Sequence, residues 1–222
     1  MAIALIFDLD GVIIDSMPLH TEAWRVYLQR LGIESTDSDI AGRMHGRRND
    51  DIVAEFISRD LAAPEIFEHG AAKERLYREL MQSQLQRCLV PGIDEFLDRW
   101  RALPLGVASN AEPANIDLVL DGLSQRGYFQ AIVNGHQVDR PKPFPDVYLR
   151  AAELLGVRPR DCVVFEDSPT GVEAGLAAGM LVVGVQTHSA DLKGVDLAIR
   201  DFQDPKLEPW LRSRVAKTNE SD

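Results

Sequence analysis

Short runs of consecutive apolar residues recur along the chain and alternate with stretches of helical periodicity. Runs without polar alternation are typical of parallel strands that are covered on both faces of a sheet. Helical spacing of apolar residues is found in 93–101 and 146–155, and Ser168-Pro169 begins another predicted helix. The predicted strands are Ala2–Phe7, Leu105–Ala108, Ala131–Asn134, Cys162–Phe165, Leu181–Val185 and Leu197–Ile199. This alternation predicts an α/β fold with a doubly wound, Rossmann-like parallel sheet.

The interval from Met17 to Arg87 interrupts the alternation, because it contains no convincing strand. Its apolar positions follow the helical period, for example from Leu19 to Leu31, where Gly32 ends the pattern. Pro91-Gly92 marks the return to the α/β pattern. We therefore expect a helical cap inserted near the carboxyl end of the first strand, where open α/β sheets bind ligands. The expected domains are an α/β core formed by 1–15 and 92–222 and a cap formed by 16–91.

An acidic motif follows the first predicted strand directly. Asp8 ends the apolar run, Asp10 lies two residues further on, and Gly11 allows a sharp turn. Residues two apart on an extended segment point the same way, so the two carboxylates share one space. Like charges this close favour a divalent cation, and Mg²⁺ binds a few carboxylates together with phosphate oxygens. A surface turn or helix cap is the alternative interpretation.

Polar side chains also follow three further predicted strands. Ser109 and Asn110 offer a small hydroxyl and a backbone N–H that suit a phosphate, although Ser-Asn is also a routine turn. Lys142 lies between two prolines, on a stiff segment suited to holding an anion or merely to linking two elements. Glu166 and Asp167 are adjacent carboxylates that either bind a cation or cap the next helix. Together the four motifs predict a phosphate and metal site at one edge of the sheet.

Composition narrows the function classes. The chain has 24 basic and 35 acidic residues and a net charge of −11, which argues against non-specific nucleic-acid binding. The two cysteines, Cys88 and Cys162, lack metal-site spacing and fit a reducing compartment. No apolar stretch approaches the length of a membrane span, and Ala2 to Phe7 is too short for a signal peptide. We expect a cytoplasmic monomer that acts on a small molecule and binds neither nucleic acid nor membrane.

With four motifs in order, the chain resembles the haloacid dehalogenase superfamily over nearly its whole length. It is most similar to the phosphatase and β-phosphoglucomutase branch, which has a helical cap after the first motif. The matching residues are Asp8-Leu9-Asp10-Gly11-Val12, Ser109, Lys142-Pro143-x-Pro145-Asp146 and Glu166-Asp167-Ser168-x-x-Gly171. The resemblance implies phosphoryl transfer rather than dehalogenation, because the dehalogenases typically lack an aspartate at the position of Asp10.

The resemblance also implies roles for the motif residues. Asp8 would attack phosphorus and form an aspartyl phosphate, and Asp10 would act as general acid and then general base. Ser109, Asn110 and Lys142 would hold the transferring phosphoryl group. The implied Mg²⁺ ligands are the Asp8 side chain, the Asp10 backbone carbonyl and Asp167, with Glu166 nearby or acting through water.

We expect the cap to decide substrate choice, and with it the choice between phosphatase and mutase. His20 and Lys73 match a histidine and a lysine of the mutase branch, although both could equally be ordinary helix residues. The mutases carry a Gly-x-Ser-Arg-Glu-x-Ser-type segment, whereas this chain has Gly46-Arg47-Arg48-Asn49-Asp50-Asp51-Ile52, with Asn49 at the arginine position. Arg47 or Arg48 could still bind a distal anion. We therefore favour a phosphatase for a small phosphorylated metabolite such as a sugar phosphate, with a β-phosphoglucomutase-type mutase as the alternative.

Two non-enzymatic interpretations are weaker. A phospho-acceptor signalling module also uses carboxylates and a lysine on a parallel sheet, but such modules are shorter and lack an inserted cap. A non-catalytic phospho-ligand-binding protein on the same fold would not need the complete motif set that this chain carries.

Overall fold

The computed structural model describes residues 3–36, 38–40, 49–188 and 191–219. The chain divides into two compact units. One unit comprises Met1–Asp15 and Gln86–Asp222 and contains the sheet, and the other comprises Ser16–Leu85 and is helical in its described residues. We call them the α/β unit and the helical unit, and each is described by itself.

The α/β unit contains one six-stranded, fully parallel sheet with the strand order β3-β2-β1-β4-β5-β6. The strands are β1 (Ala4–Phe7), β2 (Leu105–Ser109), β3 (Ala131–Asn134), β4 (Cys162–Glu166), β5 (Leu181–Val185) and β6 (Leu197–Ile199). All six predicted strands are present, and the doubly wound α/β fold is confirmed. The first strand lies in the middle, between β2 and β4. This order brings the ends of β2, β1 and β4 together at one edge, where open parallel sheets bind ligands.

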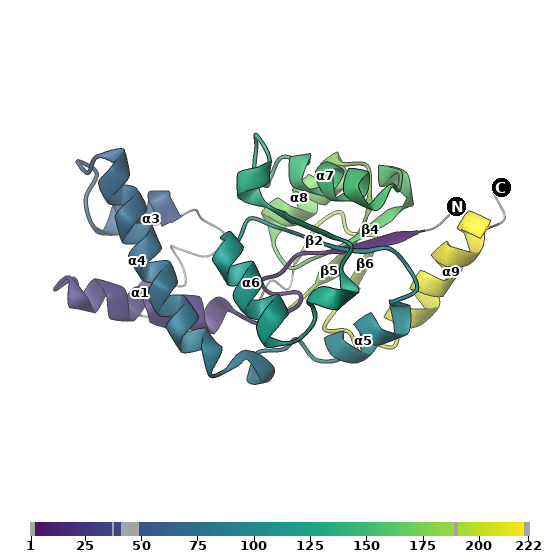
Figure 1. Ribbon diagram of the computed structural model, residues 1–222, viewed down its shortest axis with the longest axis horizontal. Coiled ribbons are helices and arrows are strands. Elements are labelled where there is room, and N and C mark those ends of the chain that lie inside the picture. Colours follow the sequence, from purple (N-terminus) through teal and green to yellow (C-terminus); the bar gives the residue numbers. More distant parts are fainter. Residues whose placement is uncertain (1–2, 37, 41–48, 189–190, 220–222) are drawn as a thin grey trace. The chain divides into compact units, whose positions relative to one another are not determined.

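Helices cover both faces of this sheet. Its α-helices are α5 (Ile93–Trp100), α6 (Pro113–Gly122), α7 (Asp146–Leu155), α8 (Pro169–Ala177) and α9 (Leu207–Asn219). Short 3₁₀ turns are η1 (Leu85–Arg87), η2 (Arg126–Tyr128), η3 (Gly135–Gln137) and η4 (Pro159–Asp161). Helices α7 and α8 lie on one face, and α5 and α9 on the other (Figure 1). Helices α6 and α9 were not among the elements predicted from the sequence.

Alternation along the central strands directs side chains into two cores. Ile6 and Val164 point to the face of α7 and α8, where they join Tyr148 and Val172 in one buried cluster. Their neighbours on the strands face the other way. The aromatic cluster on that second face includes Phe7, Phe96, Phe165 and Phe202, and the rings of Phe7 and Phe165 stack at 4.8 Å. Burial on both faces explains why the strands are continuously apolar.

The segment that follows β1 is tied down by hydrogen bonds within the α/β unit. Ile14 pairs with Leu89 in an antiparallel bridge, and the Asp15 N–H donates to the carbonyl of Cys88 at 2.6 Å. The two points at which the chain passes between the units are therefore paired with each other. Residues 86–91 belong to the α/β unit by their contacts.

The helical unit contains α1 (Met17–Arg30), α3 (Asn49–Phe56) and α4 (Ala63–Gln82). Its helices bury a small apolar cluster of their own, made of Trp24, Leu28, Ile40, Ile52 and Val53. Pro at the first turn of α1 and α4 fits a helix start, because proline lacks the N–H that would be unpaired there.

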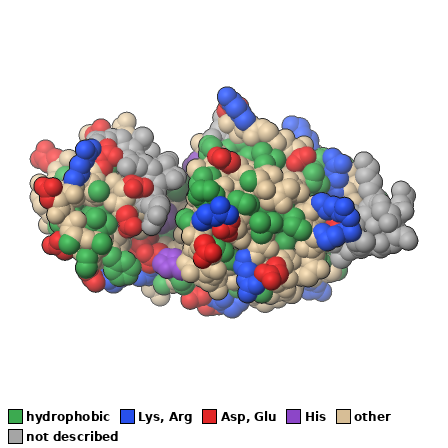
Figure 2. Space-filling model, turned by 90° about the horizontal axis from the view of Figure 1, so that it is seen from above, with side chains coloured by type: hydrophobic (Ala, Val, Ile, Leu, Met, Phe, Trp, Pro, Cys, Tyr) green, Lys and Arg blue, Asp and Glu red, His purple; other side chains and the backbone are tan. Residues whose placement is uncertain are grey.

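Charge is mixed on the surface of the α/β unit. On the side of α7 and α8, Figure 2 shows acidic and basic side chains interspersed with apolar ones. The net negative charge of the chain therefore does not form one large patch on this face. Within the described residues, none of the helices is both long and apolar enough to cross a membrane.

Candidate active site

The strand order brings three of the four predicted motifs side by side. Asp8 directly follows β1, Ser109 is the last residue of β2, and Glu166 is the last residue of β4. β1 pairs with both β2 and β4, so the three ends are adjacent. All three side chains are buried, with exposures of 8%, 2% and 0%. Chemically active groups thus lie at the carboxyl edge of the sheet, inside the protein rather than on its surface.

The lysine of the remaining motif reaches the same place. Lys142 Nζ lies 2.8 Å from Asp8 Oδ1 and 2.6 Å from Glu166 Oε1. Burial alone would lower the pKa of Lys142, but the two carboxylates outweigh burial and raise it above its ordinary value. The ammonium therefore stays charged beside Asp8.

Three carboxylates crowd around this lysine. Oxygens of Asp8, Glu166 and Asp167 all lie within 4.8 Å of one another. Burial raises the pKa of Asp8 to about 7, with Glu166 and Asp10 adding to the rise and Lys142 opposing it. Burial and the charges of Glu166, Asp8 and Asp10 raise the pKa of Asp167 to about 9. When all three carboxylates are ionised, they exceed the Lys142 ammonium by two negative charges, which a divalent cation would balance.

The backbone after β1 passes close to the acidic cluster. Gly11 has φ +75°, and a Cβ at this position would collide with the Asp167 carboxylate, so the chain turns here without a side chain. Carboxylate oxygens are the ligands that hard divalent cations prefer. The residues of the structure therefore fit a divalent metal at Asp8 and Asp167. The carboxylate of Asp10 is not part of the three-residue group, and the metal contact expected from its backbone carbonyl stays a prediction.

Glu166 is already surrounded by hydrogen-bond donors. Its Oε1 accepts from Lys142 Nζ and from the Tyr148 hydroxyl, each at 2.6 Å. Its Oε2 accepts from Asp167 N at 3.1 Å, from Ser168 N at 3.2 Å and from Ser168 Oγ at 3.0 Å. A carboxylate has about four lone-pair sites, so these five donors use its capacity. A direct metal contact by Glu166 would therefore displace one of them, which favours contact through water.

The two residues at the end of β2 differ in what their side chains do. Ser109 Oγ accepts from Ala111 N at 3.1 Å, which leaves the hydroxyl proton available to a phosphate oxygen. The side chain of Asn110 instead binds the backbone of Lys142: Oδ1 accepts from the Lys142 N–H at 3.1 Å, and Nδ2 donates to its carbonyl at 3.4 Å. Because the Asn110 side chain is used in this way, its backbone N–H is the group that could contact a phosphate. The phosphate-binding role of Asn110 stays a prediction.

Two predicted residues of the helical unit are brought together. Lys73 Nζ lies 2.7 Å from His20 Nδ1, and the His20 ring stacks on Tyr77 at 3.8 Å. Lys73 is only 2% exposed, and it forms an ion pair with Glu74 at 2.9 Å. Lysine is rarely buried unless it is paired, so this is not an ordinary solvated helix lysine. The other two predicted residues, Arg47 and Arg48, lie outside the described residues.

Sequence reasoning missed Glu74 and the interaction of Asn49. Glu74 is 4% exposed, and its Oε1 accepts from Lys73 and from Asn49 Nδ2 at 2.8 Å. Burial would raise the pKa of Glu74, but Lys73 and His20 together with these hydrogen bonds lower it to about 2. Glu74 is therefore a permanent counter-charge to Lys73. In the sequence, the only sign of this pair is that Glu74 directly follows Lys73, and this adjacency does not reveal that both side chains are buried.

Tyr148 was also missed. It lies on α7, six positions after Lys142, and its hydroxyl donates to Glu166. Burial and the nearby carboxylates raise its pKa well above the ordinary tyrosine value, so the hydroxyl keeps its proton. A tyrosine at helical spacing normally indicates core packing, and the single sequence carries no sign of this polar contact.

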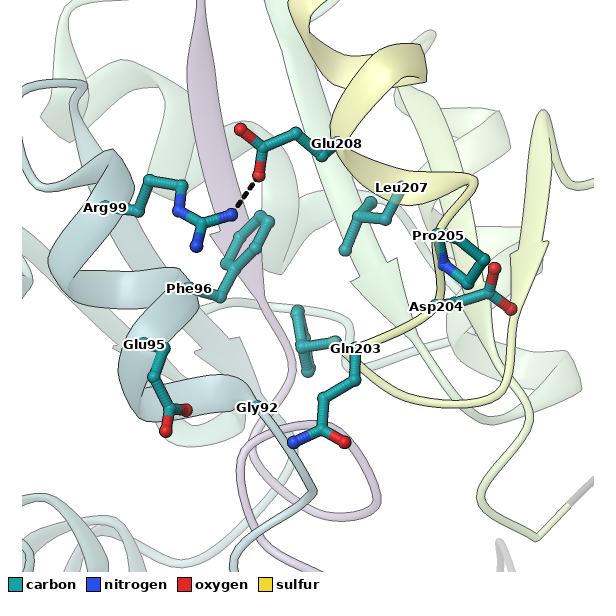
Figure 3. A pocket seen from close by; sticks show the side chains of 10 residues that line it. Gly92, Glu95, Phe96, Arg99, Gln203, Asp204, Pro205, Leu207 and Glu208 are labelled. Atoms are coloured by element: carbon teal, nitrogen blue, oxygen red, sulfur yellow. Dashed lines mark hydrogen bonds and ion pairs between the residues drawn. The ribbon is translucent and has the colours of Figure 1, made fainter.

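A pocket elsewhere in the α/β unit is separate from this chemistry. It has a volume of about 450 Å³ and lies between α5 and the segment that begins α9. Figure 3 shows its lining, with an ion pair between Arg99 and Glu208 on one side and Gln203 on another. None of its lining residues belongs to the four motifs. The acidic cluster, and not this pocket, is the candidate active site.

The site combines a buried aspartate after the first strand with a lysine, a hydroxyl and an acidic pair. This combination is typical of phosphoryl-transfer enzymes that use an aspartate. The model of the haloacid dehalogenase-like hydrolase family matches residues 4–179. The chain belongs to this family, and the membership predicted from the motifs is confirmed. It is an enzyme of the phosphatase or phosphoglucomutase type within the family.

The relatives of the chain include both phosphatases and phosphoglucomutases. The chain is 34% identical to a fructose-1-phosphate phosphatase of Escherichia coli, over 82% of this chain and 95% of that protein. It is 32% identical to a β-phosphoglucomutase of Bacillus subtilis, over 97% and 98% of the two chains. Among solved structures, CbbY of Rhodobacter sphaeroides in complex with xylulose-(1,5)bisphosphate matches with a TM-score of 0.80 at 25% identity, over 91% and 95% of the chains.

Proposed function

We propose that the protein is a Mg²⁺-dependent phosphatase that hydrolyses a small sugar phosphate through an aspartyl phosphate on Asp8. The observation that carries the proposal is the buried contact of Asp8 with Lys142 beside the carboxylates of Glu166 and Asp167. Support for a sugar phosphate comes from the relatives, which include a fructose-1-phosphate phosphatase and a protein named phosphorylated carbohydrates phosphatase.

The first step transfers the phosphoryl group to the protein. An oxygen of Asp8 forms a bond to phosphorus while the bond from phosphorus to the ester oxygen breaks. The electron pair of the broken bond stays on the leaving oxygen, which takes a proton from Asp10. Lys142 and the Ser109 hydroxyl hold the transferring group, since phosphoryl transfer depends chiefly on positioning and charge neutralisation.

The second step returns Asp8 to its carboxylate form. A water oxygen forms a bond to phosphorus, and the bond from phosphorus to the Asp8 oxygen breaks. Asp10, now a carboxylate, accepts the proton of that water, so the acid and base roles are restored after each turnover. When bound, Mg²⁺ at Asp8 and Asp167 would supply the positive charge that lets a phosphate approach carboxylates.

The helical unit is proposed to determine substrate choice. We assign the helical unit the role of a cap domain, in which His20, Lys73, Arg47 and Arg48 recognise the leaving group of the substrate. A mutase must also bind a bisphosphate, which calls for an uncompensated cation. The charge of Lys73 is balanced by Glu74, and Asn49 donates to the same carboxylate oxygen. This pairing supports a phosphatase over the alternative, a β-phosphoglucomutase-type mutase, which is favoured by the match to the Bacillus subtilis relative.

Hydrolysis tests the proposed function directly. The purified protein is expected to release phosphate from a generic aryl phosphate with Mg²⁺ and to lose that activity in EDTA, because the carboxylates around Asp8 would otherwise repel the substrate. With β-glucose 1-phosphate and a trace of the 1,6-bisphosphate, free phosphate is expected to appear faster than glucose 6-phosphate. Glucose 6-phosphate appearing first would establish the mutase instead, and equal rates with and without Mg²⁺ would contradict both.

Removing the counter-charge of Lys73 is expected to change substrate preference. Glu74→Gln keeps the shape of the side chain but removes the negative charge 2.9 Å from Lys73, so a second phosphate meets less repulsion there. We expect the ratio of kcat/KM for fructose 1,6-bisphosphate to that for fructose 1-phosphate to rise about tenfold, the order of one new charge interaction.

The matched control is Glu79→Gln, which removes an exposed carboxylate from the same helix. It is expected to leave the ratio of the two substrates unchanged. Thermal unfolding of both variants separates a change in preference from a loss of folded protein. If the ratio in Glu74→Gln equals that of the control, Glu74 does not determine this preference.

A further inference from the structure

One oxygen of Glu166 is shared by Lys142 and Tyr148. Both donors lie 2.6 Å from Oε1. The Lys142 ammonium also lies over the face of the Tyr148 ring, 4.8 Å from its centroid, which is a cation–π contact. Tyr148 is fully buried on α7. Tyr148 therefore interacts with Lys142 in two ways. Its ring contacts the ammonium directly, and its hydroxyl donates to the same Glu166 oxygen as the ammonium.

The hydroxyl of Tyr148 limits where Oε1 can lie. Three donors on Oε2 hold one side of the Glu166 carboxylate. Without the hydroxyl, Lys142 would be the one remaining donor to Oε1. The positions of Oε1 and of the Lys142 ammonium would then depend on each other. With the hydroxyl present, Oε1 is fixed by the protein, and the ammonium lies between it and Asp8 Oδ1.

The backbone of Lys142 is held separately. The Asn110 side chain accepts from the Lys142 N–H and donates to the Lys142 carbonyl. Asn110 follows β2, so these two hydrogen bonds connect the loop of Lys142 to the rigid sheet. A side chain with four rotatable bonds points to one place only when both of its ends are held.

We propose that Tyr148 and Asn110 are positioning residues of Lys142, Tyr148 acting on its ammonium through Glu166 and Asn110 on its backbone. This inference rests on the proposed function, which assigns Lys142 to the transferring phosphoryl group. Neither side chain touches the reacting atoms. Both raise the rate because they keep the lysine in the one position from which it reaches Asp8.

Tyr148→Phe and Asn110→Ala test the two contacts. With an aryl phosphate and saturating Mg²⁺, each is expected to lower kcat/KM about tenfold, the usual effect of losing a supporting hydrogen bond. The dissociation constant of inorganic phosphate, measured by calorimetry, is expected to rise severalfold in both. The Mg²⁺ concentration for half-maximal activity is expected to stay within about a factor of two, because Glu166 keeps its other donors.

Matched controls remove the same groups at other places. Tyr128→Phe deletes a tyrosine hydroxyl at the amino-terminal edge of the sheet, and Gln130→Ala deletes an exposed side-chain amide at the same edge, which accepts from the Leu105 N–H and donates to the Tyr128 carbonyl. Both are expected to behave like the parent protein in turnover and in phosphate binding.

A Lys142→Ala background separates positioning from a general structural role. Without the ammonium there is nothing to position, so neither substitution should change residual turnover or phosphate binding further. The inference is overturned if kcat/KM and phosphate affinity are unchanged in the single variants, if their losses recur in full without Lys142, or if excess Mg²⁺ restores the activity.

Misfolding of a variant and failure of the proposed function can each be told apart from failure of the positioning inference. If Tyr148→Phe does not fold, Asn110→Ala decides, since Asn110 is exposed and its removal leaves no buried gap. If the parent protein fails to hydrolyse any phosphate ester, the proposed function is wrong. Phosphate affinity then still tests whether Tyr148 and Asn110 position Lys142.

Discussion

Asp8→Asn is expected to abolish Mg²⁺-dependent hydrolysis of an aryl phosphate, with turnover falling by roughly 10³-fold or more because the proposed nucleophile is lost. An amide does not form an acyl phosphate, and it also removes the negative partner that lies 2.8 Å from Lys142. Phosphate release measures the rate. Mass spectrometry after an acid quench is expected to detect a phosphorylated peptide containing Asp8 in the parent and not in the variant.

The control for this substitution is Asp98→Asn. Asp98 is an exposed residue of α5 and pairs only weakly with Arg101 at 3.3 Å, so its charge can be removed with little effect on stability. It is expected to keep the full rate. Retention of Mg²⁺-dependent turnover by Asp8→Asn would show that the aspartyl phosphate forms elsewhere or not at all, and the assigned mechanism would then be wrong.

The core of this site could be predicted because it depends on strand ends. Asp8, Ser109 and Glu166 are close because parallel strands finish at the same edge, and apolar runs reveal where strands finish. The predicted ends were one residue short at β2 and β4. Ser109 pairs with Asn134 and Glu166 pairs with Gly184, so the candidate site residues Ser109 and Glu166 lie within the ladder. That regular backbone is what holds them rigidly.

Contacts between separate helices and loops could not be predicted in the same way. Tyr148 reaches Glu166 from α7, and Asn49 reaches Glu74 across 25 positions of the sequence. Neither pair has a periodic signal, because each depends on how one element packs on another. The same reason explains why α9 was missed: its polar composition hides two buried leucines, Leu207 and Leu211, that only the folded unit reveals.

Charge links the composition to the site. Part of the formal net charge of −11 comes from the buried carboxylates, and burial together with neighbouring charges raises the pKa of Asp8 and of Asp167. The helical unit uses the opposite arrangement, in which Lys73 and Glu74 neutralise each other inside a small core. The carboxylate cluster of the α/β unit therefore calls for a cation, whereas the Lys73–Glu74 pair of the helical unit is already balanced. This contrast is the physical basis for assigning the metal and the phosphoryl group to the α/β unit.

Asp167→Asn is expected to raise the melting temperature of the metal-free protein while lowering its Mg²⁺-dependent activity about 100-fold or more, since losing even an outer-shell partner of a metal ligand costs about 10- to 100-fold. Burial and neighbouring charges raise the pKa of Asp167 to about 9, whereas an unfolded aspartate loses its proton near 4. Between these values the folded state binds more protons. Stability of the metal-free parent therefore falls as the pH rises through this window.

The uncharged amide carries no such penalty, so the advantage in melting temperature of Asp167→Asn over the parent should grow from about pH 5 to about pH 9. Mg²⁺ should reverse the order, because it stabilises the ionised carboxylates of the parent and releases their protons, most effectively at high pH. Thermal unfolding in EDTA and in Mg²⁺ measures both effects, with the exposed Asp191→Asn as the control. A parent-like Mg²⁺ shift in Asp167→Asn would mean that the cation does not bind Asp167. A lower melting temperature in EDTA across the whole range would mean that Asp167 stabilises the fold rather than straining it.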